Sequence, residues 1–181
     1  MALILEDGTG LVPTANSYVS RAEFFLYWAD RFDAAFDPTS LAFPLLSIDR
    51  ALIKATDYIE MRFRNRFKGF RLVYSPDPQP LSFPRAYLYV RCLPVLGVPK
   101  DLKAATCEYA KRILLNPAGL LPDPGGYDAT GQLIVSNRRK VGPIEVDVTY
   151  EAGSSDAIRS YPVADRLLSD YVVCSDGCIR N

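Results

Sequence analysis

The chain has 181 residues, 49% of them hydrophobic, and its 21 Lys and Arg balance 21 Asp and Glu, so the formal net charge is zero. This length and composition predict a soluble globular protein with a real core, built as one domain or as one domain with appended arms. A protein that coats DNA with its whole surface carries excess positive charge, so any basic patch here must be local. The absence of histidine excludes Ser-His-Asp and Cys-His catalysis and every His-metal site.

The N-terminal part is predicted to be an extended arm followed by a helix. Residues 1–19 begin with a short apolar run and continue through the turn residues Asp7-Gly8-Thr9-Gly10. Ser20-Arg21-Ala22-Glu23 fits a capping box, in which serine and glutamate satisfy each other's free backbone N–H groups. We therefore expect a first helix from Ser20 to about Phe32, with its aromatic residues mostly facing a core.

A second helix shows the best periodicity in the chain. Its apolar residues recur at three- to four-residue steps: Ile48, Leu52, Ala55, Ile59 and Phe63. This spacing predicts one buried face of an amphipathic helix. Ser47 is a candidate cap at its start, and Gly69 is a natural stop after its end.

Proline dominates the segment 72–99, which excludes a helix or a central strand there. We expect a long loop, with a short edge strand near Tyr87–Arg91. Loops of this length in compact domains are usually functional or become ordered on binding. A third helix is predicted to start at Pro99, a favourable first-turn residue, and to end before Asn116-Pro117.

The last third of the chain predicts two strands and a closing helix. After a turn-rich connection at 118–131, GQLIVSN and VGPIEVDVTYEA read as strands, and the second alternates apolar with polar residues. PVADRLLSDYVV predicts a short helix, and residues 173–181 a loose tail. The predicted fold is mainly α: a bundle of about four helices with a two-stranded β-hairpin and long extended arms and loops, as a single domain over 1–172.

No catalytic, cofactor or metal signature is found in the sequence. Gly8 and Gly10 do not form a dinucleotide loop, no phosphate-binding GxxxxGK[ST] occurs, and the acidic residues lack the order of a calcium loop. The cysteines are interpreted as reduced and structural: Cys92, Cys107, Cys174 and Cys178. MALILEDGTG lacks the basic start of a signal peptide, and no segment is long enough to cross a bilayer. We expect a non-enzyme without cofactors, in a cytosol-like compartment.

The stretch MRFRNRFKGFR at 61–71 is the main candidate for binding. Basic side chains neutralise phosphates and aromatic rings stack on bases, so it is typical of a nucleic-acid site. The same residues also fit a helix end, with Phe63 and Phe67 in the core and cations favoured by the helix dipole. A third interpretation turns the arginines toward phosphates or an acidic partner. Arg138-Arg139-Lys140 is a second basic cluster, expected at the bend between the two strands. The nucleic-acid-facing candidates are Arg62, Arg64, Arg66, Lys68, Arg71, Arg138, Arg139 and Lys140.

The order of elements resembles a family of small tailed-bacteriophage proteins encoded beside the capsid genes. The resemblance rests on GTGLVPTANSYVS, SFPR, LLPDPGGYDATGQ and above all VSNRRKVGPIEVDVTY, and it spans about residues 1–172. By overall plan these proteins look like head–tail connectors, also called adaptor, neck or head-completion proteins. Some carry the label "DnaT-like single-stranded-DNA-binding protein".

The resemblance implies a structural adaptor in the virion, at the head–tail interface, after assembly in the host cytoplasm. It implies a homo-oligomeric ring, usually of twelve copies, under the portal protein. The ring would let double-stranded DNA pass and would dock a tail or stopper (tail-completion) protein, with no membrane involved. A ring subunit must bury surface against two neighbours through a closing heterologous interface. The alternative is a DnaT-like single-stranded-DNA-binding protein in phage replication.

Overall fold

The structure, a computed structural model, describes residues 2–31, 36, 43–73, 79–116, 134–140, 145–150 and 161–173. The chain forms two compact units, one of Met1–Leu120 with Tyr161–Asn181 and the other of Leu121–Ser160. The tail with Cys174 and Cys178, and the turn-rich connection predicted at 118–131, lie outside the described residues.

Helix α1 spans Arg21–Ala29 and starts as its sequence predicts. The Ser20 hydroxyl accepts a hydrogen bond from the Glu23 N–H, and the Glu23 carboxylate accepts one from the Ser20 N–H at 2.8 Å, which completes the capping box. Phe24 and Trp28 are buried, which confirms an inward aromatic face. The helix ends at Ala29, three residues before the predicted Phe32.

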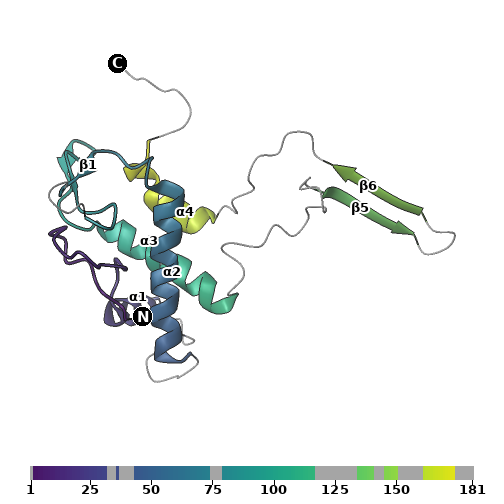
Figure 1. Cartoon of the computed structure of the whole chain (residues 1–181), viewed down its shortest axis with the longest axis horizontal. Coiled ribbons are helices and arrows are strands. Elements are labelled where there is room, and N and C mark those ends of the chain that lie inside the picture. Colours follow the sequence, from purple (N-terminus) through teal and green to yellow (C-terminus); the bar gives the residue numbers. More distant parts are fainter. Residues whose placement is uncertain are drawn as a thin grey trace, which may run out of the picture. The chain divides into compact units, whose positions relative to one another are not determined.

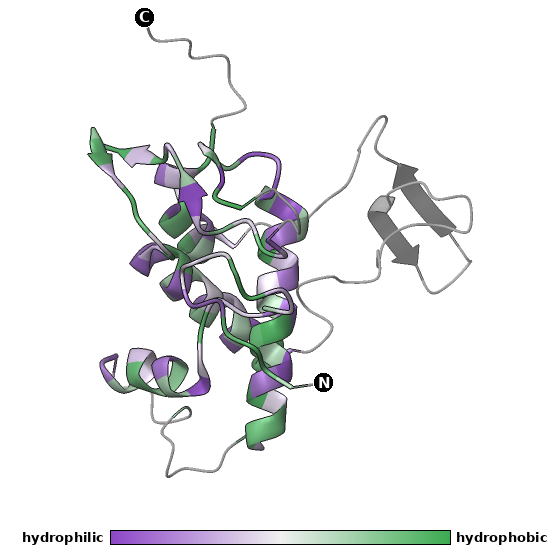
Figure 2. Cartoon of the chain, turned by 60° about the vertical axis from the view of Figure 1, so that its left-hand side comes forward, coloured by the Kyte–Doolittle hydropathy of each residue, from purple (hydrophilic) through white to green (hydrophobic). Residues whose placement is uncertain are grey.

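Helix α2 spans Leu45–Phe63 and is the longest element (Figure 1). All five residues of the predicted apolar face are buried, which confirms the prediction of an amphipathic helix. The predicted cap was wrong: Pro44 precedes the helix, no side chain caps it, and Ser47 lies within its first turn. A proline there fixes the backbone for helix entry without needing a capping side chain. Hydrophobic and hydrophilic residues both occur along the described helices (Figure 2), as in helices that bury one face and expose the other.

Helix α3 spans Lys100–Leu115 and packs against both α2 and α4. It starts one residue after the predicted Pro99, which is its N-cap, and it ends before Asn116 as predicted. The closing helix α4 spans Pro162–Leu168 and continues as one 3-10 turn, η2, over Ser169–Tyr171. Tyr109 and Leu168 are fully buried, so α3 and the closing helix share the core with α2.

Short strands lie between α2 and α3. β1 (Phe70–Arg71) pairs antiparallel with β2 (Arg85–Ala86), and β3 (Tyr89–Val90) pairs antiparallel with β4 (Leu93–Pro94). The expected edge strand is therefore shorter than predicted, because Tyr87 and Arg91 have left-handed backbone angles that strands do not accommodate. Leu81, Phe83 and Leu88 are buried, so part of this proline-rich loop belongs to the core.

The segment from residue 2 to residue 19 also lies on the core. Leu5 and Ser17 form a parallel β-bridge, and the Ile4 carbonyl accepts hydrogen bonds from the Asn16 and Ser17 N–H groups. Tyr18 and Val19 are fully buried at its end, where the Tyr18 ring meets Phe83 edge-on. This segment contains no helix, and the buried Tyr18 and Val19 attach its C-terminal end to the core of the same chain.

In the second unit, β5 (Ile134–Lys140) pairs antiparallel with β6 (Glu145–Tyr150). This pairing confirms the predicted hairpin. The basic cluster Arg138-Arg139-Lys140 lies within β5, so its predicted place at the bend was wrong: the pairing extends through it, with Lys140 opposite Glu145. Among the residues that the structure describes, four helices with small antiparallel sheets confirm the mainly α fold class. In the described part of the chain, no helix is long and apolar enough to span a membrane.

Candidate nucleic-acid interface

The phenylalanines of the stretch 61–71 divide between core and surface. Phe63 and Phe67 are each only 5% exposed, and their ring centroids lie 6.2 Å apart. Phe67 also meets Phe83 edge-on, with 4.9 Å between the ring centroids. Phe70, by contrast, is 62% exposed. The first two rings therefore hold the fold together, and Phe70 is the ring of this stretch that can stack on a base.

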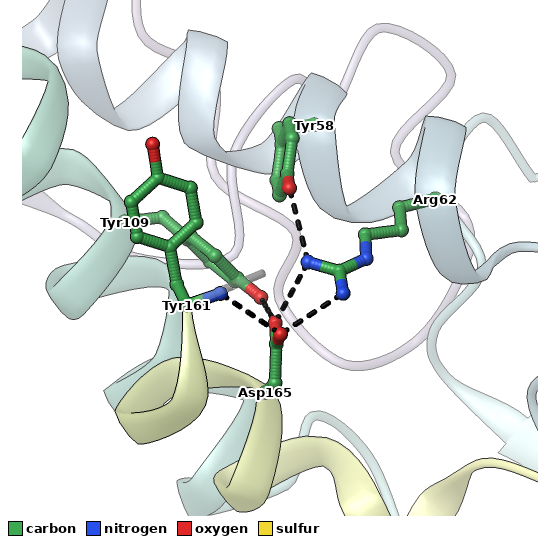
Figure 3. A network of polar contacts seen from close by, with 5 residues as sticks. All are labelled: Tyr58, Arg62, Tyr109, Tyr161 and Asp165. Carbon is green, nitrogen blue, oxygen red and sulfur yellow. Dashed lines mark hydrogen bonds and ion pairs between the residues drawn. The ribbon is translucent and has the colours of Figure 1, made fainter. Parts of the chain in front are cut away.

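Arg62 is held inside the first unit by α4 (Figure 3). Its guanidinium makes a bidentate pair with the Asp165 carboxylate, with two N–O distances of 2.9 Å, and donates to the Tyr58 hydroxyl at 3.0 Å. Asp165 also accepts hydrogen bonds from the Tyr109 hydroxyl and the Tyr161 N–H. The Arg62 side chain is 15% exposed. The positive charge of Arg62 is thus neutralised by the Asp165 carboxylate within the first unit.

The protonation states of this network follow from burial and pairing. Burial alone would lower the pKa of Arg62, but the contacts with Tyr58 and Asp165 raise it above its usual value. Burial, together with the hydrogen bond to Asp165, raises the pKa of Tyr109 well above that of a free tyrosine. Arg62 therefore stays charged and Tyr109 neutral across the pH range in which proteins are handled.

The other cations of the stretch lie at or near the surface. Arg64 and Arg66 are exposed where α2 ends, while Lys68 and Arg71 are half-buried. The Lys68 ammonium donates to the Asp170 carbonyl oxygen at 2.9 Å. The structure therefore brings four of the five basic candidates from this stretch to one end of α2.

Three surface residues of the following loop were missed by sequence reasoning. Tyr87 is 77% exposed, Tyr89 is 55% exposed, and Arg91 is exposed beside Asp170, 3.8 Å from its carboxylate. Asp170 thus contacts both Lys68 and Arg91, which places them near each other. Proline density hid these residues, because it predicts a loop without showing which side chains face out. The basic–aromatic surface comprises Arg64, Arg66, Lys68, Phe70, Arg71, Tyr87, Tyr89 and Arg91.

Arg85 binds the backbone beneath the side chains of this surface. Its guanidinium donates to the carbonyl oxygens of Lys68 and Gly69 at 2.7 Å, and at 3.2 Å to those of Phe67 and Ser82. A planar fork with five N–H donors suits this set of acceptors better than the point charge of a lysine. Arg85 therefore fixes the backbone that carries Lys68 and Phe70. In the sequence, only the position of Arg85 in the SFPR segment distinguishes it from the other arginines.

Charge is unevenly distributed along the chain. Seven of its 21 Lys and Arg fall within residues 61–91, beside a single acidic residue, Asp77. The basic patch is therefore local, as a neutral chain requires. The three basic residues of β5 belong to the second unit. Within the described ranges, no three His, Cys, Asp or Glu residues are placed to hold a metal ion.

Comparison with known families adds one finding. A sequence model of the family described as "Putative DnaT-like ssDNA binding protein" matches residues 1–181. The chain belongs to this family. Its members' description matches the second label of the resemblance found in the sequence, which is thereby confirmed, while the head–tail connector assignment stays a prediction. Neither the curated proteins nor the solved structures contain a match to the chain.

Proposed function

We propose that this protein binds single-stranded DNA through the basic–aromatic surface, as a non-catalytic binding protein in phage replication. The observation that carries the proposal is Phe70, 62% exposed and flanked in the sequence by Lys68 and Arg71. Exposure of an aromatic ring to water is unfavourable, and stacking against the bases of a single strand would remove the ring from water. Double-stranded DNA hides its base faces and offers no such cover.

The cations around Phe70 supply the second part of such a site. Arg64 and Arg66 are exposed and reach solvent from the end of α2, so they can neutralise phosphates along a strand. Tyr87 and Tyr89 add further exposed rings from the neighbouring loop. Base stacking on aromatic side chains is tolerant of sequence, so we expect little base preference. Membership of the DnaT-like family supports the same function.

Fluorescence anisotropy with a labelled single-stranded oligonucleotide tests the proposal. Wild-type protein should bind in a salt-sensitive way and prefer the single strand over a duplex of the same sequence. The pair Arg64→Ala and Arg66→Ala should weaken binding and reduce the slope of log K against log salt by about 1.4. Arg50→Ala with Lys54→Ala is the matched control, since both residues are exposed on the same helix away from this surface.

Two results would overturn this function. One is the absence of any binding at low salt. The other is an equal loss of affinity in the control pair, which would show that only the overall charge of the protein matters. Replacing Phe70 by Ala separates stacking from charge, because it should lower affinity without changing the salt slope.

A second candidate is the head–tail adaptor of a tailed phage, and one observation favours it. Leu93 and Leu96 are 69% and 85% exposed on and beside β4, and DNA does not account for exposed leucines. Exposed apolar residues close together in this way are typical of protein–protein contacts. In this role the protein would form a ring between the portal and a tail or stopper protein. Electron microscopy of protein mixed with portal tests it: a protein that stays monomeric with portal and is missing from virions is not an adaptor.

A further inference from the structure

The hairpin of the second unit leaves two strand edges open. β5 and β6 pair with each other, and among the described residues neither pairs with another strand. Figure 1 shows the two strands side by side. The outer edge of each strand carries backbone N–H and C=O groups that have no partner in this sheet. A lone two-stranded sheet is marginally stable in water, so additional pairing would stabilise it.

Charge separates the two strands. β5 contains Arg138, Arg139 and Lys140 and no acidic residue, whereas β6 contains Glu145 and Asp147 and no basic residue. Within the hairpin, the register places Arg138 opposite Asp147 and Lys140 opposite Glu145. Opposite charges across a ladder stabilise the pairing of strands, and like charges weaken it. A basic strand beside an acidic one is therefore the pairing that this sequence favours.

We propose that the β5 edge of one copy of this protein pairs with the β6 edge of a second copy. The rival arrangements, β5 with β5 and β6 with β6, bring like charges together and are disfavoured. Each copy presents one basic and one acidic edge, so the contact is head-to-tail and repeats from copy to copy. Such a heterologous contact closes into a ring or continues as a filament. The inference needs neither the DNA-binding nor the adaptor function.

Cross-linking between two single-cysteine proteins tests this contact in the full chain. In a background with Cys92, Cys174 and Cys178 replaced by Ser, one protein carries Ser136→Cys and the other Thr149→Cys. These positions lie opposite each other in the hairpin register, one on each strand. Cys107 is buried and does not compete. A short thiol-reactive cross-linker should give a mixed dimer when the two proteins are combined, and much less of either homodimer from each protein alone.

Charge reversal provides the second measurement. Glu145→Lys and Asp147→Lys, combined with Arg138→Glu and Lys140→Glu in one protein, exchange the charges of the two strands but keep opposite charges across the hairpin. This exchanged protein should still form the oligomer by itself in mass photometry, but it should give no mixed dimer with a partner that carries the wild-type charges. The matched control is Arg64→Glu with Arg66→Glu, which alters charge in the first unit and should leave the oligomer unchanged.

The results that overturn the proposal are equally specific. Homodimers formed by Ser136→Cys alone would show β5–β5 pairing instead. A complete lack of cross-links with the wild-type charges, in a protein that is monomeric at every concentration, would show that the edges of β5 and β6 do not pair between copies. Because the readouts are cross-links and mass, they do not depend on whether the protein binds DNA.

Discussion

Arg62 and Asp165 join α2 to α4 across 103 positions of the sequence, through two N–O contacts of 2.9 Å. The Tyr109 hydroxyl and the Tyr161 N–H complete the hydrogen bonding of the same carboxylate. The closing helix is therefore attached to the bundle by a satisfied, largely buried ion pair. Arg62 stands among four other cations in the sequence, yet its task is different from theirs.

Replacing Arg62 by Met should lower the free energy of unfolding by about 3 kcal/mol, because Asp165 would be left largely buried without its cation. Urea denaturation followed by circular dichroism measures this. The affinity of the folded variant for single-stranded DNA should stay close to wild type. Asp165→Asn should destabilise similarly, and the double variant should cost less than the sum of the two. An Arg62→Met protein that is fully stable but fails to bind DNA would contradict this assignment.

Phe67 and Phe70 should respond oppositely to truncation. Phe67→Ala removes a ring packed against Phe63 and Phe83 and should cost about 3 to 5 kcal/mol of stability. Phe70→Ala should change stability by less than about 0.5 kcal/mol, since the ring is exposed. It should nevertheless weaken oligonucleotide binding by about 1 to 3 kcal/mol if the ring stacks on a base. Thermal melts paired with anisotropy distinguish the two effects, and a reversed pattern would refute the proposed surface.

Gly69→Ala should disrupt the pairing of β1 with β2. Gly69 has a φ of +73°, and a Cβ added there would lie 2.5 Å from the Ala86 carbonyl oxygen. The left-handed backbone alone costs an L-residue about 1 to 2 kcal/mol, and the clash adds to this cost. Hydrogen exchange at the amides around β1 should accelerate in the variant. Gly97→Ala is the control, because it shares the positive φ but meets no atom within 4 Å; equal damage from both would show that the clash is unimportant.

Glu6 should make stability depend on pH. Burial raises the pKa of this carboxyl, against the opposing hydrogen bonds from the Gly10 and Gly8 N–H groups. The folded protein therefore holds this proton more tightly than the unfolded chain. The contribution of Glu6 to stability falls as pH rises from the pKa of an unfolded glutamate, about 4.3, through the higher folded value.

A Glu6→Gln variant tests this, because glutamine does not titrate. The difference in melting temperature, variant minus wild type, should increase with pH across that interval and then level off. Any constant cost of burying the amide shifts the whole curve but not its direction. A difference that stays flat or decreases with rising pH would show that the carboxyl is not destabilised by burial.

The sequence predicted the helices better than the surface. The apolar pattern from Ile48 to Phe63 and the capping box of Ser20 and Glu23 are local patterns, formed by residues three or four positions apart. Such patterns can be recognised in the sequence because the same residues are neighbours in the folded helix. The partners of Arg62 and Arg85 could not be predicted, because both arginines make tertiary contacts. Asp165 lies 103 positions from Arg62, and the acceptors of Arg85 are backbone carbonyl oxygens, which no residue type marks in the sequence. The exposure of Tyr87 could not be foreseen either, since no periodic pattern marks a proline-rich loop.

The end of the described chain lies beside the basic stretch. Phe67 and Val172 form an antiparallel bridge, the Lys68 N–H donates to the Tyr171 carbonyl, and the Val173 N–H donates to the Arg66 carbonyl, both at 2.8 Å. A fluorophore or affinity tag introduced directly after Val173 would thus be tethered next to Arg66 and Lys68. Polyhistidine or an acidic dye placed there would perturb the very titrations meant to measure oligonucleotide affinity. Reporters for such assays belong at the N-terminus instead.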